Sequence, residues 1–68
     1  MPVSDVDIWR AAHLLIERHG EVAALMAAQR ADELIEDGDV EGWLIWRRIV
    51  AAIEEWQRLT PQESHEVN

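Results

Sequence analysis

The sequence predicts a small all-helical (all-α) protein, organised as a three-helix bundle with short turns. Apolar side chains recur at intervals of three and four residues, the spacing of helices with one buried face. Gly20 and Gly38 interrupt this pattern, and turns of only a few residues fold each helix back on the one before it. We therefore expect one domain over residues 1–60, with helices at about 5–19, 21–37 and 40–59, and a disordered tail over 61–68.

The first helix has a start signal and a stop signal. Ser4 can cap it, with Asp7 three residues later in the place of a capping-box acid, and Gly20 can supply the left-handed residue that ends it. Its apolar arc is wider than one neighbouring helix covers, so we expect it to contact two helices. The arc consists of Ile8, Trp9, Ala11, Ala12, Leu15 and Ile16.

The second helix has small side chains on its expected buried face. Because alanine side chains are short, the axis of another helix can approach this face closely. The expected stripe is Ala24, Ala27, Ala28, Ala31, Leu34 and Ile35, with Ala23 at its margin. Three apolar residues point away from this stripe near the start of the helix, namely Val22, Leu25 and Met26. They either fold under the turn that follows the first helix or lie open to a partner.

The third helix holds three of the four tryptophans and is expected to supply most of the core. Asp39 can cap its first turn, and Gly42 is expected on the inward side, where a missing side chain lets a neighbouring helix lie close. Leu44 faces the opposite side, and Thr60-Pro61 ends the helix. The main stripe is expected to be Ile45, Trp46, Ile49, Ala52, Ile53 and Trp56.

A chain of 68 residues has a marginal core, and such domains usually gain stability from disulfides, a metal or self-association. The absence of cysteine excludes a disulfide and every thiolate zinc site. Self-association into a homodimer is therefore favoured. The alternative to a closed bundle is a hairpin of the second and third helices that completes its core in a dimer, with the first helix folded across it.

The charge of the chain argues against several classes of partner. A net charge of −8 repels a phosphate backbone, so direct nucleic-acid binding is not expected. The start, MPVSDVD, lacks the basic and apolar regions of a signal peptide, and no apolar run reaches the ~20 residues that a membrane span needs. We expect a cytoplasmic protein without a membrane partner.

No arrangement of residues predicts an enzyme, so we expect no catalytic residue and no cofactor. The chain has no cysteine, no tyrosine and no glycine-rich loop, and its many carboxylates lie on surfaces that look solvated. His13 and Glu17 are one helical turn apart, as two metal ligands would be, but only His65 is at hand as a further ligand. We favour an exposed polar pair and predict no metal site.

The segment RADELIEDGDVEGWLIWRRIVAAIEEW and the upstream AAHLLIERHGEVA resemble a group of short, uncharacterised, mainly proteobacterial proteins. The shared pattern is an HG turn followed by GDxEGxxxWxxIxxAxxE. The resemblance implies a compact helical fold in a bacterial protein and transfers no activity. Members of the group tend to have polar residues after the glycine at position 42, where this chain has Trp43 and Leu44. This difference favours association over a simple monomer.

Two surfaces are candidate binding sites. The first comprises apolar residues at the edges of the stripes, where aromatic anchors of interfaces concentrate: Trp9, Leu14, Leu25, Met26, Trp43, Leu44 and Val50. The second is the acidic segment around the second turn: Asp32, Glu33, Glu36, Asp37, Asp39 and Glu41. The preferred hypothesis is a non-enzymatic protein that self-associates through the first surface. The alternative is an acidic decoy whose second surface occupies a basic nucleic-acid-binding protein, although a solvated charged turn is the simpler interpretation of that segment.

Overall fold

The computed structural model describes residues 4–59, and all of its regular structure is helical. Helix α1 spans Asp5–His19, a 3-10 turn η1 spans Gly20–Val22, α2 spans Ala23–Glu36 and α3 spans Val40–Leu59. The all-helical class is therefore confirmed. The expected tail over residues 61–68 and the expected stop at Thr60-Pro61 lie outside the described residues.

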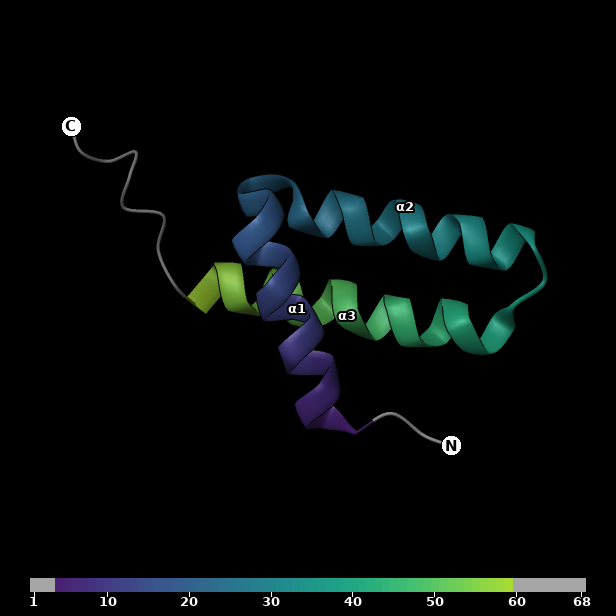
Figure 1. Ribbon diagram of the computed structural model, residues 1–68, viewed down its shortest axis with the longest axis horizontal. Coiled ribbons are helices and arrows are strands. Elements are labelled where there is room, and N and C mark those ends of the chain that lie inside the picture. Colours follow the sequence, from purple (N-terminus) through teal and green to yellow (C-terminus); the bar gives the residue numbers. More distant parts are fainter. Residues whose placement is uncertain (1–3, 60–68) are drawn as a thin grey trace.

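The helices are arranged as a hairpin with a third helix laid across it. Helices α2 and α3 run side by side in opposite directions, whereas α1 crosses α3 steeply near the C-terminal half of α3 (Figure 1). A bundle with three aligned helices is therefore not what Figure 1 shows. The arrangement resembles the alternative with the first helix folded across a hairpin, and α1 contacts both other helices, as its wide apolar arc predicted.

The two turns follow from local signals in the sequence. The hydroxyl of Ser4 accepts a hydrogen bond from the backbone N–H of Asp7 at 3.2 Å, which confirms the expected cap of α1. At the other end of α1, Gly20 has a φ of 60° and opens η1, so α2 begins two residues later than predicted, at Ala23.

The second turn has both backbone hydrogen bonds of a Schellman motif. The N–H of Gly38 donates to the carbonyl of Ile35 at 3.1 Å, and the N–H of Asp39 donates to that of Leu34 at 2.8 Å. Gly38 has a φ of 84°, which a side chain disfavours. The chain then enters α3, where the carboxylate of Asp39 accepts a hydrogen bond from the N–H of Gly42 at 2.9 Å, as an N-cap does.

The core lies where the three helices meet, and its alanines are as important as its larger residues. The buried side chains are Ile8 and Ala12 from α1, Ala23, Ala27 and Ala31 from α2, and Ile49, Val50, Ala52 and Ile53 from α3. Ile53 is the largest fully inaccessible side chain of the described part. Because the α2 residues in this group are all alanines, the hairpin helices can pack closely.

Three details of the predicted packing are wrong. Ala23, expected at the margin of its stripe, is completely buried, because η1 brings the start of α2 under the corner with α1. Ile35, expected in the stripe, is 39% exposed near the end of α2, beyond the part of the hairpin that α1 crosses. At Gly42, the atoms nearest to the position of a Cβ belong to the Asp39 side chain and not to another helix.

Two polar contacts join α1 and its corner to α3. A guanidinium nitrogen of Arg48 lies 2.6 Å from a carboxylate oxygen of Asp5, at the start of α1. The side-chain amide of Gln57 donates a hydrogen bond to the carbonyl of Gly20, 3.1 Å away, just after the end of α1. The crossing helix is therefore connected to α3 at both of its ends.

Candidate interaction groove

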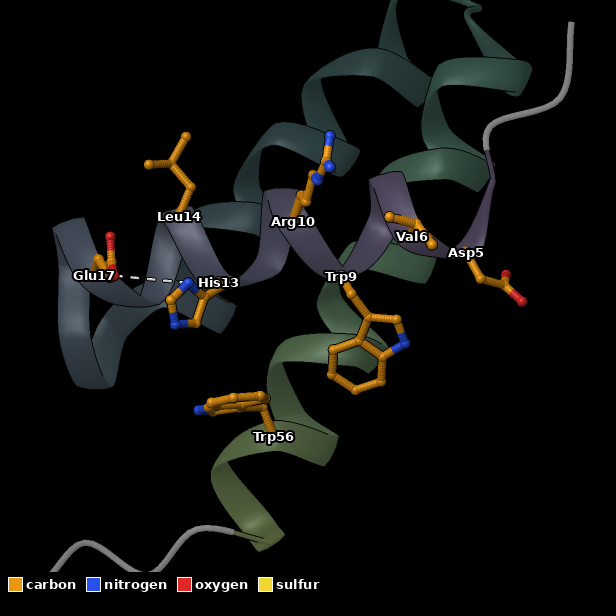
Figure 2. Close-up of a pocket in the computed structure, with 8 residues that line it drawn as sticks. All are labelled: Asp5, Val6, Trp9, Arg10, His13, Leu14, Glu17 and Trp56. Carbon is orange, nitrogen blue, oxygen red and sulfur yellow. Dashed lines mark ion pairs between the residues drawn. The ribbon is translucent and has the colours of Figure 1, made fainter.

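A surface groove of about 650 Å³ follows α1 and is closed on one side by a tryptophan of α3 (Figure 2). The groove results from the crossing, because the steep angle between α1 and α3 leaves open space beside the point where the two helices contact each other. We call this feature the α1 groove. Its lining residues are Asp5, Val6, Trp9, Arg10, His13, Leu14, Glu17 and Trp56, and all eight are exposed.

Two tryptophans form the base of the α1 groove. The ring centroids of Trp9 and Trp56 are 6.3 Å apart and their planes are tilted by 55°, which is within the range of favourable aromatic pairs. His13 meets Trp56 edge to face, with centroids 5.4 Å apart. These contacts hold apolar ring surface in a defined position while Trp9 remains 40% exposed and Trp56 38% exposed.

The exposure of Trp56 corrects a prediction. Its position on the apolar stripe of α3 predicted a core residue, like Ile53. Because α1 crosses α3 instead of running along it, Trp56 stays 38% exposed, with the rings of Trp9 and His13 packed against it. Trp46, the other tryptophan predicted for the core, is partly buried and packs against it.

The seven apolar residues predicted for an interface do not form one surface. Trp9 and Leu14 line the α1 groove, whereas Met26 lines a separate shallow depression beside Trp46. Leu25 is 56% exposed on α2 and Leu44 is 51% exposed on α3, while Trp43 is partly buried. Val50 was wrongly assigned to the interface: it is 6% exposed, because it belongs to the core between the helices.

Three important members of the α1 groove were missed by the sequence analysis, namely Val6, Arg10 and Trp56. Val6 and Arg10 share the spacing of Trp9, His13 and Glu17 along one side of a helix, so this side was visible in the sequence. The contribution of Trp56 was not, because it depends on the crossing angle between two helices.

The acidic residues predicted as a second surface gather at the other end of the hairpin. All six are exposed around the α2–α3 turn, far along the hairpin from the α1 crossing (Figure 1). Two of them have local roles: Glu33 pairs with Arg30 at 3.0 Å, and Asp39 caps α3. We call this feature the acidic tip.

The His13 and Glu17 pair occurs as the helical spacing predicted. Nδ1 of His13 lies 3.7 Å from a carboxylate oxygen of Glu17, and both side chains are more than half exposed. Within residues 4–59, no cluster of three or more histidine, cysteine, aspartate or glutamate side chains has the arrangement of a metal site. His65, considered above as a further ligand, lies outside the described residues.

Neither the helices themselves nor known proteins assign a role to these surfaces. Over the described part of the chain, no helix is both long enough and apolar enough to cross a membrane. No family model matches the chain, and neither a curated protein nor a solved structure shows significant similarity to it. The bacterial family resemblance therefore stays a prediction, and the function has to be inferred from the surface itself.

Proposed function

We propose that this chain is a non-enzymatic interaction protein that self-associates through the α1 groove. The observation that carries this proposal is the exposure of Val6, Trp9, Leu14 and Trp56 in one groove, at 60%, 40%, 48% and 38%. Aromatic and large aliphatic side chains in a shared depression are typical anchors of protein interfaces. Covering them with a second copy would add the apolar burial that a chain of this size otherwise lacks.

The form of the groove supports a protein partner over a small molecule. Small-molecule sites usually enclose most of the surface of their ligand, but every residue that lines the α1 groove is exposed. An open groove with apolar residues at helical spacing fits another helix. Its ionisable residues are Asp5, Arg10, His13 and Glu17, and all remain in contact with solvent, which supports a role in binding instead of catalysis.

This proposal also gives a role to the open arrangement of the helices. A second copy over α1 would complete the packing around the hairpin, so that the small bundle is finished only in the homodimer. We place this single domain in the cytoplasm on the basis of its composition alone, including its lack of cysteine.

Sedimentation velocity from about 1 to 100 µM, the range in which a modest interface dissociates, tests the proposal. We expect the wild type to shift from monomer to dimer as its concentration rises. Leu14→Glu places a charge in the groove and should remain monomeric at the highest concentration. Leu25→Glu, a matched control outside the groove, should behave as the wild type. A wild type that stays monomeric throughout contradicts self-association, and equal effects of the two variants contradict this choice of surface.

A second candidate function uses the acidic tip. Its six exposed carboxylates stand at one end of the hairpin, so a basic, nucleic-acid-binding protein could meet them without contacting α1. If the chain is such an acidic decoy, the immobilised protein should capture a basic partner at low salt and release it at high salt. Replacing Asp32, Glu36, Asp37 and Asp39 by their amides should abolish the capture, and unchanged capture would contradict the decoy.

A further inference from the structure

The α1 groove carries one basic and one acidic side chain whose charges are not balanced by α3. Asp5 is neutralised by its contact with Arg48, but Arg10 forms no ion pair within the described part of the chain. Glu17 has the imidazole of His13 beside it, with Nδ1 3.7 Å from a carboxylate oxygen. Apart from the paired Asp5, the charged rim of the groove therefore consists of Arg10 and Glu17.

These two side chains cannot neutralise each other within one copy. They are seven residues apart, which separates them by about 10 Å along the helix axis, whereas pairing on a helix needs a separation of three or four residues. Arg10 and Leu14 project from the edge of α1 that faces away from Trp56 (Figure 2). Glu17 follows Leu14 by three residues, so Arg10, Leu14 and Glu17 follow one another along the same side of α1.

The same side of α1 in a second copy can pair with both charges, but only if the two α1 helices are antiparallel. If two α1 helices met in parallel, Arg10 would face Arg10 and Glu17 would face Glu17. In an antiparallel pair related by a two-fold axis, the Arg10 of each copy faces the Glu17 of the other. The axis then passes beside His13 and Leu14, which lie midway between the charged pair, and Leu14 becomes covered at the centre.

The charge of the remaining surface favours the same region. The chain has a net charge of −8, and six of its acids lie at the acidic tip, so contact between two tips would bring like charges together. At the groove, Asp5 is paired with Arg48 of α3, and Arg10 and Glu17 add one charge of each sign. A second copy can therefore approach there without the repulsion that it would meet at the tip.

We propose that two copies of this chain pair through antiparallel α1 helices, held in register by reciprocal contacts between Arg10 of one copy and Glu17 of the other. This inference rests on the proposed self-association and adds its orientation, register and charge selectivity. It centres the contact on the Arg10–Leu14–Glu17 side of α1, so that Leu14 lies at the middle of the interface and Trp56 lies outside its centre. It predicts that the interface distinguishes correctly charged partners from incorrectly charged ones.

Charge reversal tests the pairing through three samples at low ionic strength. Arg10→Glu alone places two acids opposite each other in both contacts, and Glu17→Arg alone places two bases opposite each other. We expect each variant to dimerise about tenfold more weakly than the wild type, since each dimer loses two partly exposed ion pairs and gains two repulsions. An equimolar mixture of the two variants restores opposite charges at both contacts and should dimerise within about threefold of the wild type.

Arg47 and Glu54 provide a matched control, because they are also exposed and also seven residues apart, but on α3 and outside the groove lining. Arg47→Glu, Glu54→Arg and their mixture should all dimerise as the wild type does. Circular dichroism of every variant checks that the helices remain intact, as we expect for exposed positions.

The possible results separate this inference from the proposed function. Weak single variants with a restored mixture support the antiparallel pair. A wild type that dimerises while Arg10→Glu and Glu17→Arg have no effect, or a mixture no tighter than its components, overturns the antiparallel pairing but leaves self-association in place. A wild type that is strictly monomeric overturns both.

Discussion

The carboxylate of Asp39 occupies the space that a side chain at Gly42 would need. Its Oδ1 accepts a hydrogen bond from the N–H of Gly42 at 2.9 Å, and a Cβ built on Gly42 would lie 2.5 Å from its Oδ2. A side chain at Gly42 would therefore require the Asp39 carboxylate to move away from its capping position. The φ of Gly42 is not in the left-handed region, so the requirement is steric.

This relationship predicts that Gly42→Ala reduces stability, although alanine normally stabilises a helix relative to glycine by about 0.5–1 kcal/mol. The new methyl group would displace the carboxylate, and loss of such a cap costs about 1 kcal/mol. We expect a net decrease of up to about 0.5 kcal/mol in the free energy of unfolding, measured by urea denaturation with tryptophan fluorescence. In an Asp39→Ala background the same substitution should be stabilising. Equal stabilisation in both backgrounds would contradict the steric conflict.

Ile53 should be the most sensitive position of the core, because it is a large side chain with no exposed surface. We expect Ile53→Val to cost about 0.5–1.5 kcal/mol and Ile53→Ala about 2–5 kcal/mol. A chain of this length has a total stability of roughly 3–10 kcal/mol, so the alanine variant should be partly unfolded without denaturant.

Urea denaturation followed by circular dichroism measures both changes at Ile53. Ile35→Ala is the matched control, since Ile35 is 39% exposed at the end of α2 and leaves a smaller loss of buried surface. Equal costs of alanine at residues 53 and 35 would contradict the assigned core.

The sequence predicts local features well because their causes are local. Ser4, Gly20, Gly38 and Asp39 act on residues within one turn of themselves, and each ends or begins a helix where expected. The angle between α1 and α3 depends on how distant side chains fit together, and no spacing along the chain encodes it. Trp56 shows the consequence, since its stripe position is correct but its burial depends on that angle.

Removing a negative charge should change the free energy of unfolding in opposite directions at the two ends of the α2–α3 turn. Glu36 is the last residue of α2, where the helix dipole disfavours an acid, and Glu41 is in the first turn of α3, where the dipole favours one. We expect Glu36→Gln to raise the free energy of unfolding by about 0.3–1 kcal/mol and Glu41→Gln to lower it by a similar amount.

Denaturation at low and high salt checks the origin of these two effects, because salt screens the dipole interaction and should reduce both. If both substitutions were stabilising, repulsion among the acids of the tip would outweigh the dipoles, and the prediction for Glu41 would be wrong.

The polar contacts at the ends of α1 should stabilise its crossing more than they stabilise the hairpin. Arg48 contacts Asp5 at the start of α1, and Gln57 contacts the carbonyl of Gly20 after its end. Arg48→Gln combined with Gln57→Ala removes the exposed ion pair with Asp5 and the hydrogen bond to Gly20, which together contribute about 1–2 kcal/mol. We expect α1 to separate locally while α2 and α3 stay paired, because stability is not uniform over a small fold.

Hydrogen exchange resolves this difference along the chain. Amides of α1 near Ala12 should lose about tenfold in protection, whereas those near Ala27 and Ile53 should change less. Arg58→Gln is the control, since the Arg58–Glu55 ion pair lies within α3. A uniform loss of protection in the double variant would mean that α1 and the hairpin unfold as one unit. In that case the α1 groove could not open without unfolding the protein, and any partner would have to bind the preformed surface beside Trp9 and Trp56.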